Sequence, residues 1–269
     1  MKRPEKPKYL LDLKDFDEKE KSIWIPADAK NLERLKDLAV ENLWVNGAKE
    51  KELEKIFSFV KPKFLKLYNL LVKDLSILES LVTTETIILE WNTKSESLWN
   101  IAKNVSLKYL EINDFSKLKN IEEIANSKQI LELTICGGIN KAIKIESLKP
   151  ITNLFNLEAL SLWNLKIDDN SLRPIGNLKK LKLLEISNQF ETNEYAWLAM
   201  KMKNTECKMF NAVNSCNITD ANKKTVWDTM VTGRRKSFLL STKDQAKIEK
   251  YKVEFEKLKS QYEKENSSS

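Results

Sequence analysis

The chain has 269 residues, of which 42% are hydrophobic and 32% are charged, and it contains only 5 glycines and 6 prolines. This composition is too apolar for a disordered protein, and the scarcity of turn residues argues against a β-sandwich or a β-barrel. The net charge of +7 is uneven, because residues 201–269 carry 15 basic residues against 9 acidic ones. The first 200 residues are therefore nearly neutral, which argues against a nucleic-acid-binding surface along their whole length.

Residues 1–40 precede any regular pattern. They begin with basic residues and contain no continuous apolar stretch of signal-peptide length. A short apolar run at 23–25 stops at Pro26, and residues 31–38 favour a helix. We interpret this region as an N-terminal cap in which Trp24 seals the core. Three cysteines, an odd number in a chain without an export signal, indicate reduced thiols and predict a cytoplasmic location.

A short apolar motif recurs between residues 41 and 212. The clearest copy is Leu157-x-x-Leu160-x-Leu162-x-x-Leu165, and its second apolar position recurs at residues 43, 65, 87, 110, 133, 160, 184 and 207. Such a regular step is not expected of random apolar clusters. Each copy predicts a short strand with one buried face. The stretches 50–59, 75–82 and 195–203 between these strands favour helices.

This motif resembles that of the leucine-rich-repeat family, in particular its short bacterial and internalin-like type. The resemblance covers about eight repeats over residues 41–212, although the asparagine typical of the motif is clear only at Asn92. It implies an α/β solenoid with a curved parallel sheet on the concave side and short helices on the convex side. Because an open solenoid exposes its core at both ends, residues 1–40 and 213–269 are predicted to be caps.

Residues 213–241 interrupt the repeat and suggest a loop with a short pair of strands. A helix is then predicted to start at Thr242-x-x-Gln245, which has the spacing of a capping box. Apolar residues follow at steps of three and four, at Ile248, Tyr251, Phe255, Leu258 and Tyr262. They form one stripe of an amphipathic helix, which we expect to pack across the last repeat. A coiled coil or a membrane-surface helix is the alternative.

Motifs for catalysis and metal binding are lacking in the sequence. The chain has no histidine, which removes the commonest general base and the usual catalytic zinc ligand. It also has no glycine-rich phosphate-binding motif and no cysteine pair at metal-ligand spacing. Some bacterial leucine-rich-repeat proteins are ubiquitin ligases with a Cys-x-Asp motif, which none of Cys136, Cys207 and Cys216 matches. We therefore expect no enzymatic activity, no cofactor and no metal.

Side chains that alternate with the core leucines are predicted to face the concave side. Aromatic residues occupy such positions on five of the eight predicted strands, together with five glutamates. Exposed tryptophan and tyrosine are enriched among the residues that dominate binding at protein interfaces. We therefore predict a protein-binding surface formed by Trp44, Tyr68, Glu90, Tyr109, Glu111, Trp163, Glu185 and Phe210. Packing of several of these side chains over loops or caps is the alternative.

The densest basic cluster is Arg234, Arg235 and Lys236, which follow Gly233. One hypothesis is that it binds an anionic partner, such as nucleic acid or a membrane surface. A solvated surface loop accounts for the same residues without a function, and a self-associating solenoid is a third possibility. The predicted concave face carries five glutamates against two lysines, which favours a protein partner. We expect a monomer that does not bind nucleic acid or membranes.

Overall fold

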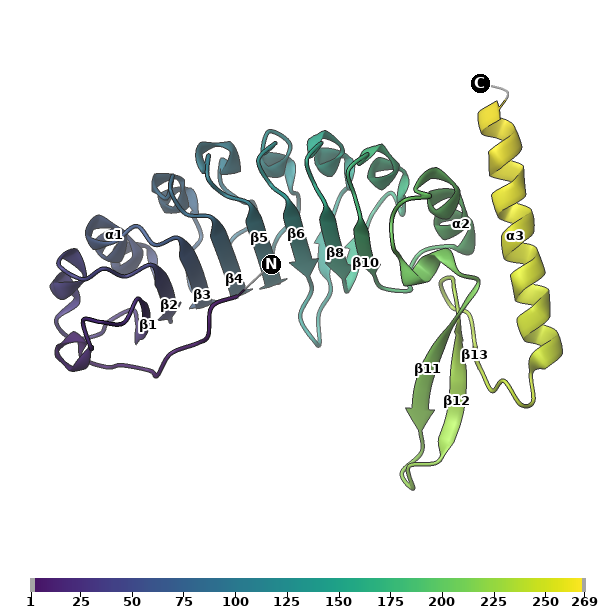
Figure 1. The fold of residues 1–269 in the computed structure, drawn as a ribbon, viewed down its shortest axis with the longest axis horizontal. Helices are drawn as coiled ribbons and strands as arrows, with labels where there is room; N and C mark the ends of the chain where they lie inside the picture. The colour runs from purple at the N-terminus through teal and green to yellow at the C-terminus, as the bar shows by residue number, and fades with distance from the viewer. Residues whose placement is uncertain (1–2, 268–269) are drawn as a thin grey trace.

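The computed structural model describes residues 3–267, so residues 1–2 and 268–269 of the two expected caps lie outside the described residues. The chain forms an arched solenoid around one long parallel sheet (Figure 1). Its eight strands lie side by side in chain order: β1 Ser22–Pro26, β2 Asn42–Asn46, β3 Phe64–Leu70, β4 Thr86–Asn92, β5 Tyr109–Phe115, β6 Glu132–Cys136, β8 Ala159–Trp163 and β10 Leu183–Ile186. A small parallel pair, β7 Ile143–Ile145 and β9 Leu165–Ile167, lies outside this sheet. The leucine-rich-repeat fold expected from the sequence is confirmed.

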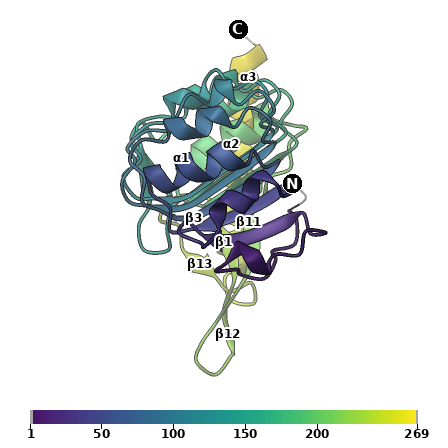
Figure 2. The ribbon, with the colours of Figure 1, turned by 90° about the vertical axis from the view of Figure 1, so that its left-hand side faces the viewer.

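The connections between strands carry helical turns along the outer side of the arch (Figure 2). Two are α-helices, α1 Glu50–Phe59 and α2 Thr192–Lys201. The remaining turns are 3-10 helices: η1 Leu13–Asp15, η2 Leu32–Lys36, η3 Ser76–Ser80, η4 Ile101–Lys103, η5 Glu122–Ile124, η6 Lys149–Asn153, η7 Arg173–Asn177 and η8 Lys208–Phe210. The helix expected over 75–82 is therefore a single 3-10 turn, the form in which short helical segments commonly occur.

The apolar pair of each strand points into one shared core. Leu162 and Ile186, the matching positions of neighbouring repeats, are register partners in β8 and β10, and both are buried. Some polar side chains within the core pair with the backbone of a neighbouring repeat. The buried amide of Asn92 donates a hydrogen bond to the carbonyl of Val72 and accepts from the backbone amide of Ser95 at 2.9 Å. This asparagine, identified from the repeat, therefore links two neighbouring turns of the solenoid.

The eight observed strands differ from the eight expected ones at both ends. The apolar run at 23–25 forms β1, which pairs in parallel with β2 and extends the sheet by one strand. The strand expected around Cys207 is not formed, which corrects the sequence prediction. Glu206 makes only an isolated bridge to Leu183, and η8 follows. The 3-10 turn places Met209 in the core, and the chain then leaves the sheet.

Beyond the sheet, the chain forms an antiparallel hairpin, β11 Val213–Thr219 and β12 Thr225–Val231, edged by β13 Phe238–Leu239. The short strand pair suggested by the sequence is thus confirmed. The last helix, α3 Gln245–Ser267, runs beside α2 at the end of the arch (Figure 1). Its expected capping box at Thr242 does not form, because the helix begins three residues later, after Asp244. The Asp244 carboxylate instead accepts from the backbone amide of Leu240.

The apolar stripe of α3 packs on the body of the protein. Phe255 is buried in the main core, and Ile248 joins a small cluster with Val231 and Leu239 at the base of the hairpin. Its stabilising role as a cap remains a prediction. Within residues 3–267, none of the helices combines the length and the apolar character that crossing a membrane requires.

Candidate binding surface

Three rows of side chains cover the concave face, because the parallel strands are paired residue by residue. The middle row is Trp24, Trp44, Lys66, Ile88, Glu111, Thr134, Ser161 and Glu185. The row before it is Ser22, Asn42, Phe64, Thr86, Tyr109, Glu132, Ala159 and Leu183, and the row after it runs from Pro26 through Asn46, Tyr68, Glu90, Asn113 and Cys136 to Trp163. The face is thus aromatic near β1 and more acidic from β4 onward.

The aromatic end of the face is covered. Trp44 is only 4% exposed and forms a cluster with Phe64 and Ile88, and its ring centroid lies 4.9 Å from that of Phe64. Trp24 packs against this cluster, and its ring centroid lies 4.5 Å from that of Tyr9. The sequence prediction that Trp44 is an exposed contact is therefore wrong. A segment from the amino terminus covers this part of the face.

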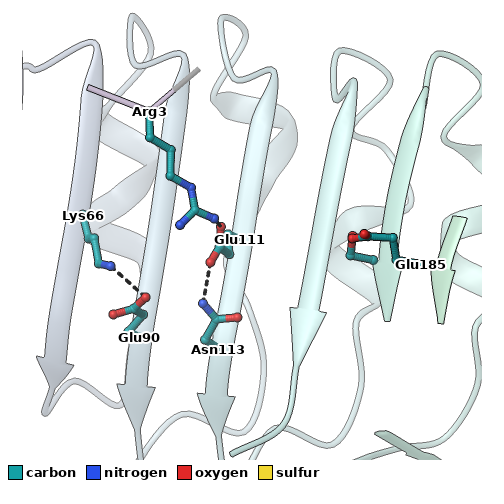
Figure 3. Close-up of polar contacts among 7 residues, drawn as sticks. Arg3, Lys66, Glu90, Glu111, Asn113 and Glu185 are labelled. Carbon is teal, nitrogen blue, oxygen red and sulfur yellow. Dashed lines mark hydrogen bonds and ion pairs between the residues drawn. The ribbon is translucent and has the colours of Figure 1, made fainter. Parts of the chain in front are cut away.

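That segment, residues 3–9, is called the N-terminal arm below. It crosses the concave face from β1 toward β5 (Figure 1). The Lys6 ammonium group sits 3.3 Å from the centroid of the Trp24 ring. Arg3 forms an ion pair with Glu111, whose other carboxylate oxygen accepts a hydrogen bond from the Asn113 amide at 2.6 Å (Figure 3). Glu111, one of the predicted contact residues, is therefore buried beneath the arm.

Next to the arm, an aromatic pair is open to solvent. Tyr68 and Trp91 are each 45% exposed, and their ring centroids are 5.9 Å apart. Glu90 is the register partner of Tyr68 and directly precedes Trp91 in the chain. Its carboxylate forms an ion pair with the Lys66 ammonium group at 2.8 Å (Figure 3). Tyr68 and Glu90 were predicted from strand alternation. Trp91 was missed because it lies at the strand end, where the alternation breaks.

The backbone of Trp91 is in the left-handed region, with φ of 58°. The same position of other repeats has Gly47, Asn69, Asp114 and Asn164, all with positive φ. Glycine, asparagine and aspartate tolerate this conformation, whereas a bulky aromatic residue is a rare exception. Aligning the repeats with one another therefore shows a small residue at this position in the other four, and Trp91 stands out as the exception.

A second open region lies at the last strand. Trp163 is 42% exposed, Leu183 is similarly open, and both line a groove of about 360 Å³ with Met230 of the hairpin. Glu185 is also exposed here and accepts a hydrogen bond from the Ser161 hydroxyl at 2.8 Å (Figure 3). Trp163 and Glu185 were predicted. Leu183 faces the same side by the strand alternation but was not among the predicted contacts. The groove depends on the hairpin, which the repeat pattern does not describe.

Two further predicted contacts have different surroundings. Tyr109 is half-buried in the first row of the sheet, near Glu111. Phe210 lies in η8 and packs against the main core. Its predicted place on an outward-facing strand is therefore wrong, because residues 208–210 form a 3-10 turn where a strand was expected.

The basic cluster lies away from the concave rows, after β12. Arg234 pairs with Glu191 at 2.6 Å, and its backbone amide donates to the carbonyl of Phe190. The Lys236 ammonium group lies 5.2 Å from the ring centroid of Tyr251. Arg235 is exposed and has a positive φ of 60°. Two of the three cations thus contact different neighbouring groups of the protein.

The middle of the face is acidic, and its carboxylates contribute to a shift in the pKa of the Cys136 thiol. Partial burial, followed by the negative charges of Glu111 and Asp114, raises the pKa of Cys136. The field of these two carboxylates, the smaller contribution after burial, disfavours an anion at this place. The same field favours a cation, and Arg3 is the cation found there.

No protein-family model and no curated protein matches this chain. Solved structures with a similar arrangement are those of an internalin C2 and an internalin F of Listeria monocytogenes and of a leucine-rich-repeat protein of Leptospira interrogans. The internalin C2 is 20% identical with a TM-score of 0.49, covering 67% of this chain and 74% of that one. The corresponding values are 16%, 0.45, 69% and 64% for the internalin F, and 22%, 0.32, 69% and 57% for the Leptospira protein.

Proposed function

We propose that this leucine-rich-repeat solenoid binds a protein partner on its concave face and catalyses no reaction. The observation that carries the proposal is the exposed aromatic pair of Tyr68 and Trp91, in which Trp91 occupies a backbone conformation suited to glycine or asparagine. A left-handed conformation costs a non-glycine residue roughly 1–2 kcal/mol. Backbone strain of this kind concentrates at functional sites, because only a benefit elsewhere maintains it.

The chemistry of the open surface favours a protein over an anionic polymer. Tyr68, Trp91, Trp163 and Leu183 offer rigid apolar area, of the kind that dominates binding at protein interfaces. The glutamates of the three rows outnumber their single lysine, Lys66, and would repel phosphates. We further propose that the protein acts as a monomer in the cytoplasm, consistent with its three free thiols. Cell fractionation and sedimentation would test these two points.

The first experiment replaces Trp91 by asparagine, the residue found at the same position of two other repeats. If Trp91 is kept for binding, Trp91→Asn will raise the free energy of unfolding by about 1 kcal/mol, since it relieves the left-handed strain. The same change will weaken partner binding at least tenfold. The partner would first be isolated by affinity capture from native lysate and identified by mass spectrometry.

A matched control is Trp227→Thr, which removes a similarly exposed tryptophan from the β12 strand of the hairpin. This change should leave partner affinity within twofold of the wild type. Unchanged binding by Trp91→Asn, with loss of binding by Trp227→Thr, would move the interface from the concave face to the hairpin and refute the proposal.

A further inference from the structure

We propose that the concave face binds an extended cationic peptide segment, with an arginine and a lysine three residues apart, and that the N-terminal arm is its resident occupant. A partner that carries such a segment would bind by displacing the arm. This inference rests on the proposed function and adds to it the chemistry of the partner and a competitor within the chain.

The path of the arm shows that it lies extended across the strands. Tyr9 bridges to Trp24 on β1, and Arg3 reaches Glu111 on β5, four strands further along the sheet. Five inter-strand steps separate Tyr9, which bridges to β1 from outside, from Glu111 on β5, and they amount to roughly 24 Å. Six residues of extended chain span about 20 Å, and the long Arg3 side chain covers the remainder. Pro4 and Pro7 within the arm favour this conformation and lower the entropy cost of holding it. The arm therefore lies on the face as an extended bound peptide would.

Two side chains of the concave face contact the two cationic side chains of the arm, Lys6 and Arg3. Lys6 lies on the face of the Trp24 ring, and Arg3 pairs with Glu111 (Figure 3). A cation over an indole ring and a guanidinium group on a buried carboxylate are both favourable contacts for a peptide with this spacing. The binding determinants are thus Trp24 and Glu111, which are both in the middle row of the face. An arginine and a lysine three residues apart span this separation with their long side chains.

The fit of the arm is incomplete, which separates it from a core element. A cavity of about 230 Å³ remains beside it, lined by Lys6, Trp24, Trp44, Tyr68 and other residues of the middle strands. The side chain of Arg3 is 53% exposed although its partner Glu111 is buried. A segment with a side chain that fills this cavity would bind better than the arm does. The arm is therefore suited to be displaced.

The face continues beyond the arm. Past Glu111, the middle row reaches Glu185, which is exposed and close to the groove at Trp163. A partner segment longer than the arm would place a further basic residue near Glu185 and an apolar one in the groove. The open half of the face would thereby add the affinity by which a partner outcompetes the tethered arm.

The test uses competition between the arm and a free peptide. A short tether holds its ligand at an effective concentration on the order of millimolar, so the arm stays bound only if its free dissociation constant is below that value. The probe is an acetylated, fluorescent peptide with the sequence of residues 3–9, titrated to millimolar concentration and followed by fluorescence anisotropy. The proteins are the full wild-type chain and the full chain with Arg3→Glu and Lys6→Glu, in which charge repulsion unseats the arm.

We expect the double variant to bind the peptide at least tenfold more tightly than the wild type, since its own arm no longer competes. Adding Glu111→Gln to the double variant should abolish this binding. Adding Glu158→Gln, which changes a carboxylate outside the three rows of the face that pairs with Lys182, should preserve it. A peptide of the same composition with arginine and lysine adjacent should bind at least tenfold more weakly than the probe.

The inference is wrong if the double variant binds the peptide no better than the wild type, or if Glu158→Gln abolishes binding as fully as Glu111→Gln. Self-association of the wild-type chain in sedimentation, lost in the double variant, would assign the face to the arm of a second copy and also overturn it. A protein partner that binds at Tyr68 and Trp91 regardless of the arm's charge would leave the proposed function standing and refute only this inference.

Discussion

The hydroxyl group of Tyr195 holds the turn between β10 and α2, so its removal measures how much that turn contributes to stability. The side chain is fully buried. Its oxygen accepts hydrogen bonds from the backbone amides of Gln189 at 3.0 Å and Phe190 at 3.1 Å, and it donates to the carbonyl of Ser187 at 2.6 Å. Burial raises the pKa of Tyr195 to about 12, so the hydroxyl stays protonated and can donate at every physiological pH.

Tyr195→Phe keeps the ring and its edge contact with Phe190, but it removes three hydrogen bonds. The Gln189 amide still donates to the Ser187 carbonyl at 2.9 Å, whereas the Phe190 amide loses its partner. A buried group left unpaired costs about 1–3 kcal/mol, and partial relaxation of the turn recovers part of that sum. We therefore expect the free energy of unfolding to fall by about 1–3 kcal/mol. Urea unfolding followed by circular dichroism measures this loss, with Tyr68→Phe, an exposed tyrosine, as the control. A Tyr195→Phe protein within about 0.5 kcal/mol of the wild type would refute the assignment of the turn to this hydroxyl.

Two other changes test the end of the solenoid. Phe255→Ala should lower the free energy of unfolding by about 3–5 kcal/mol if α3 caps the core, and an unchanged melting temperature would show that the helix is an independent element. Burial raises the pKa of Cys207 to about 11, so this thiol keeps its proton in the folded protein when the unfolded chain loses it. Stability should therefore decline between about pH 9 and 11, by up to ~1.4 kcal/mol per pH unit from this group, and Cys207→Ala should flatten that decline in denaturant titrations at stepped pH.

The sequence sufficed to predict the features that depend on local pattern. The alternation in motifs such as Leu160-x-Leu162 predicted both the strands and their buried faces, because a period of two places every second side chain on one side of the sheet. The same alternation identified Tyr68, Trp163 and Glu185 as concave, and the structure leaves their side chains partly or largely open.

The features that sequence reasoning missed depend on contacts between distant segments. Trp44 satisfies the alternation, but residues 3–9 cover its end of the face, which no pattern near position 44 reveals. Cys207-x-Met209 has the spacing of a strand, yet a 3-10 turn inserts Met209 into the core as the chain leaves the sheet. Phe210 moves away from the concave face for the same reason. Trp91 required a comparison between repeats of the positions with positive φ, since its backbone conformation is what distinguishes it.

The measurement that tests the concave-face interface most directly is the dissociation constant of the isolated partner for two multiple variants at two salt concentrations. Tyr68→Ala with Trp163→Ala removes an exposed aromatic ring from each open part of the face, and should weaken binding by more than ~2 kcal/mol while the melting temperature holds. Replacing Arg234, Arg235 and Lys236 by serine should change the affinity less than twofold. The opposite pattern, in which the basic triple variant loses binding, the aromatic double variant keeps it, and wild-type affinity falls steeply with salt, would contradict the account and indicate an anionic partner.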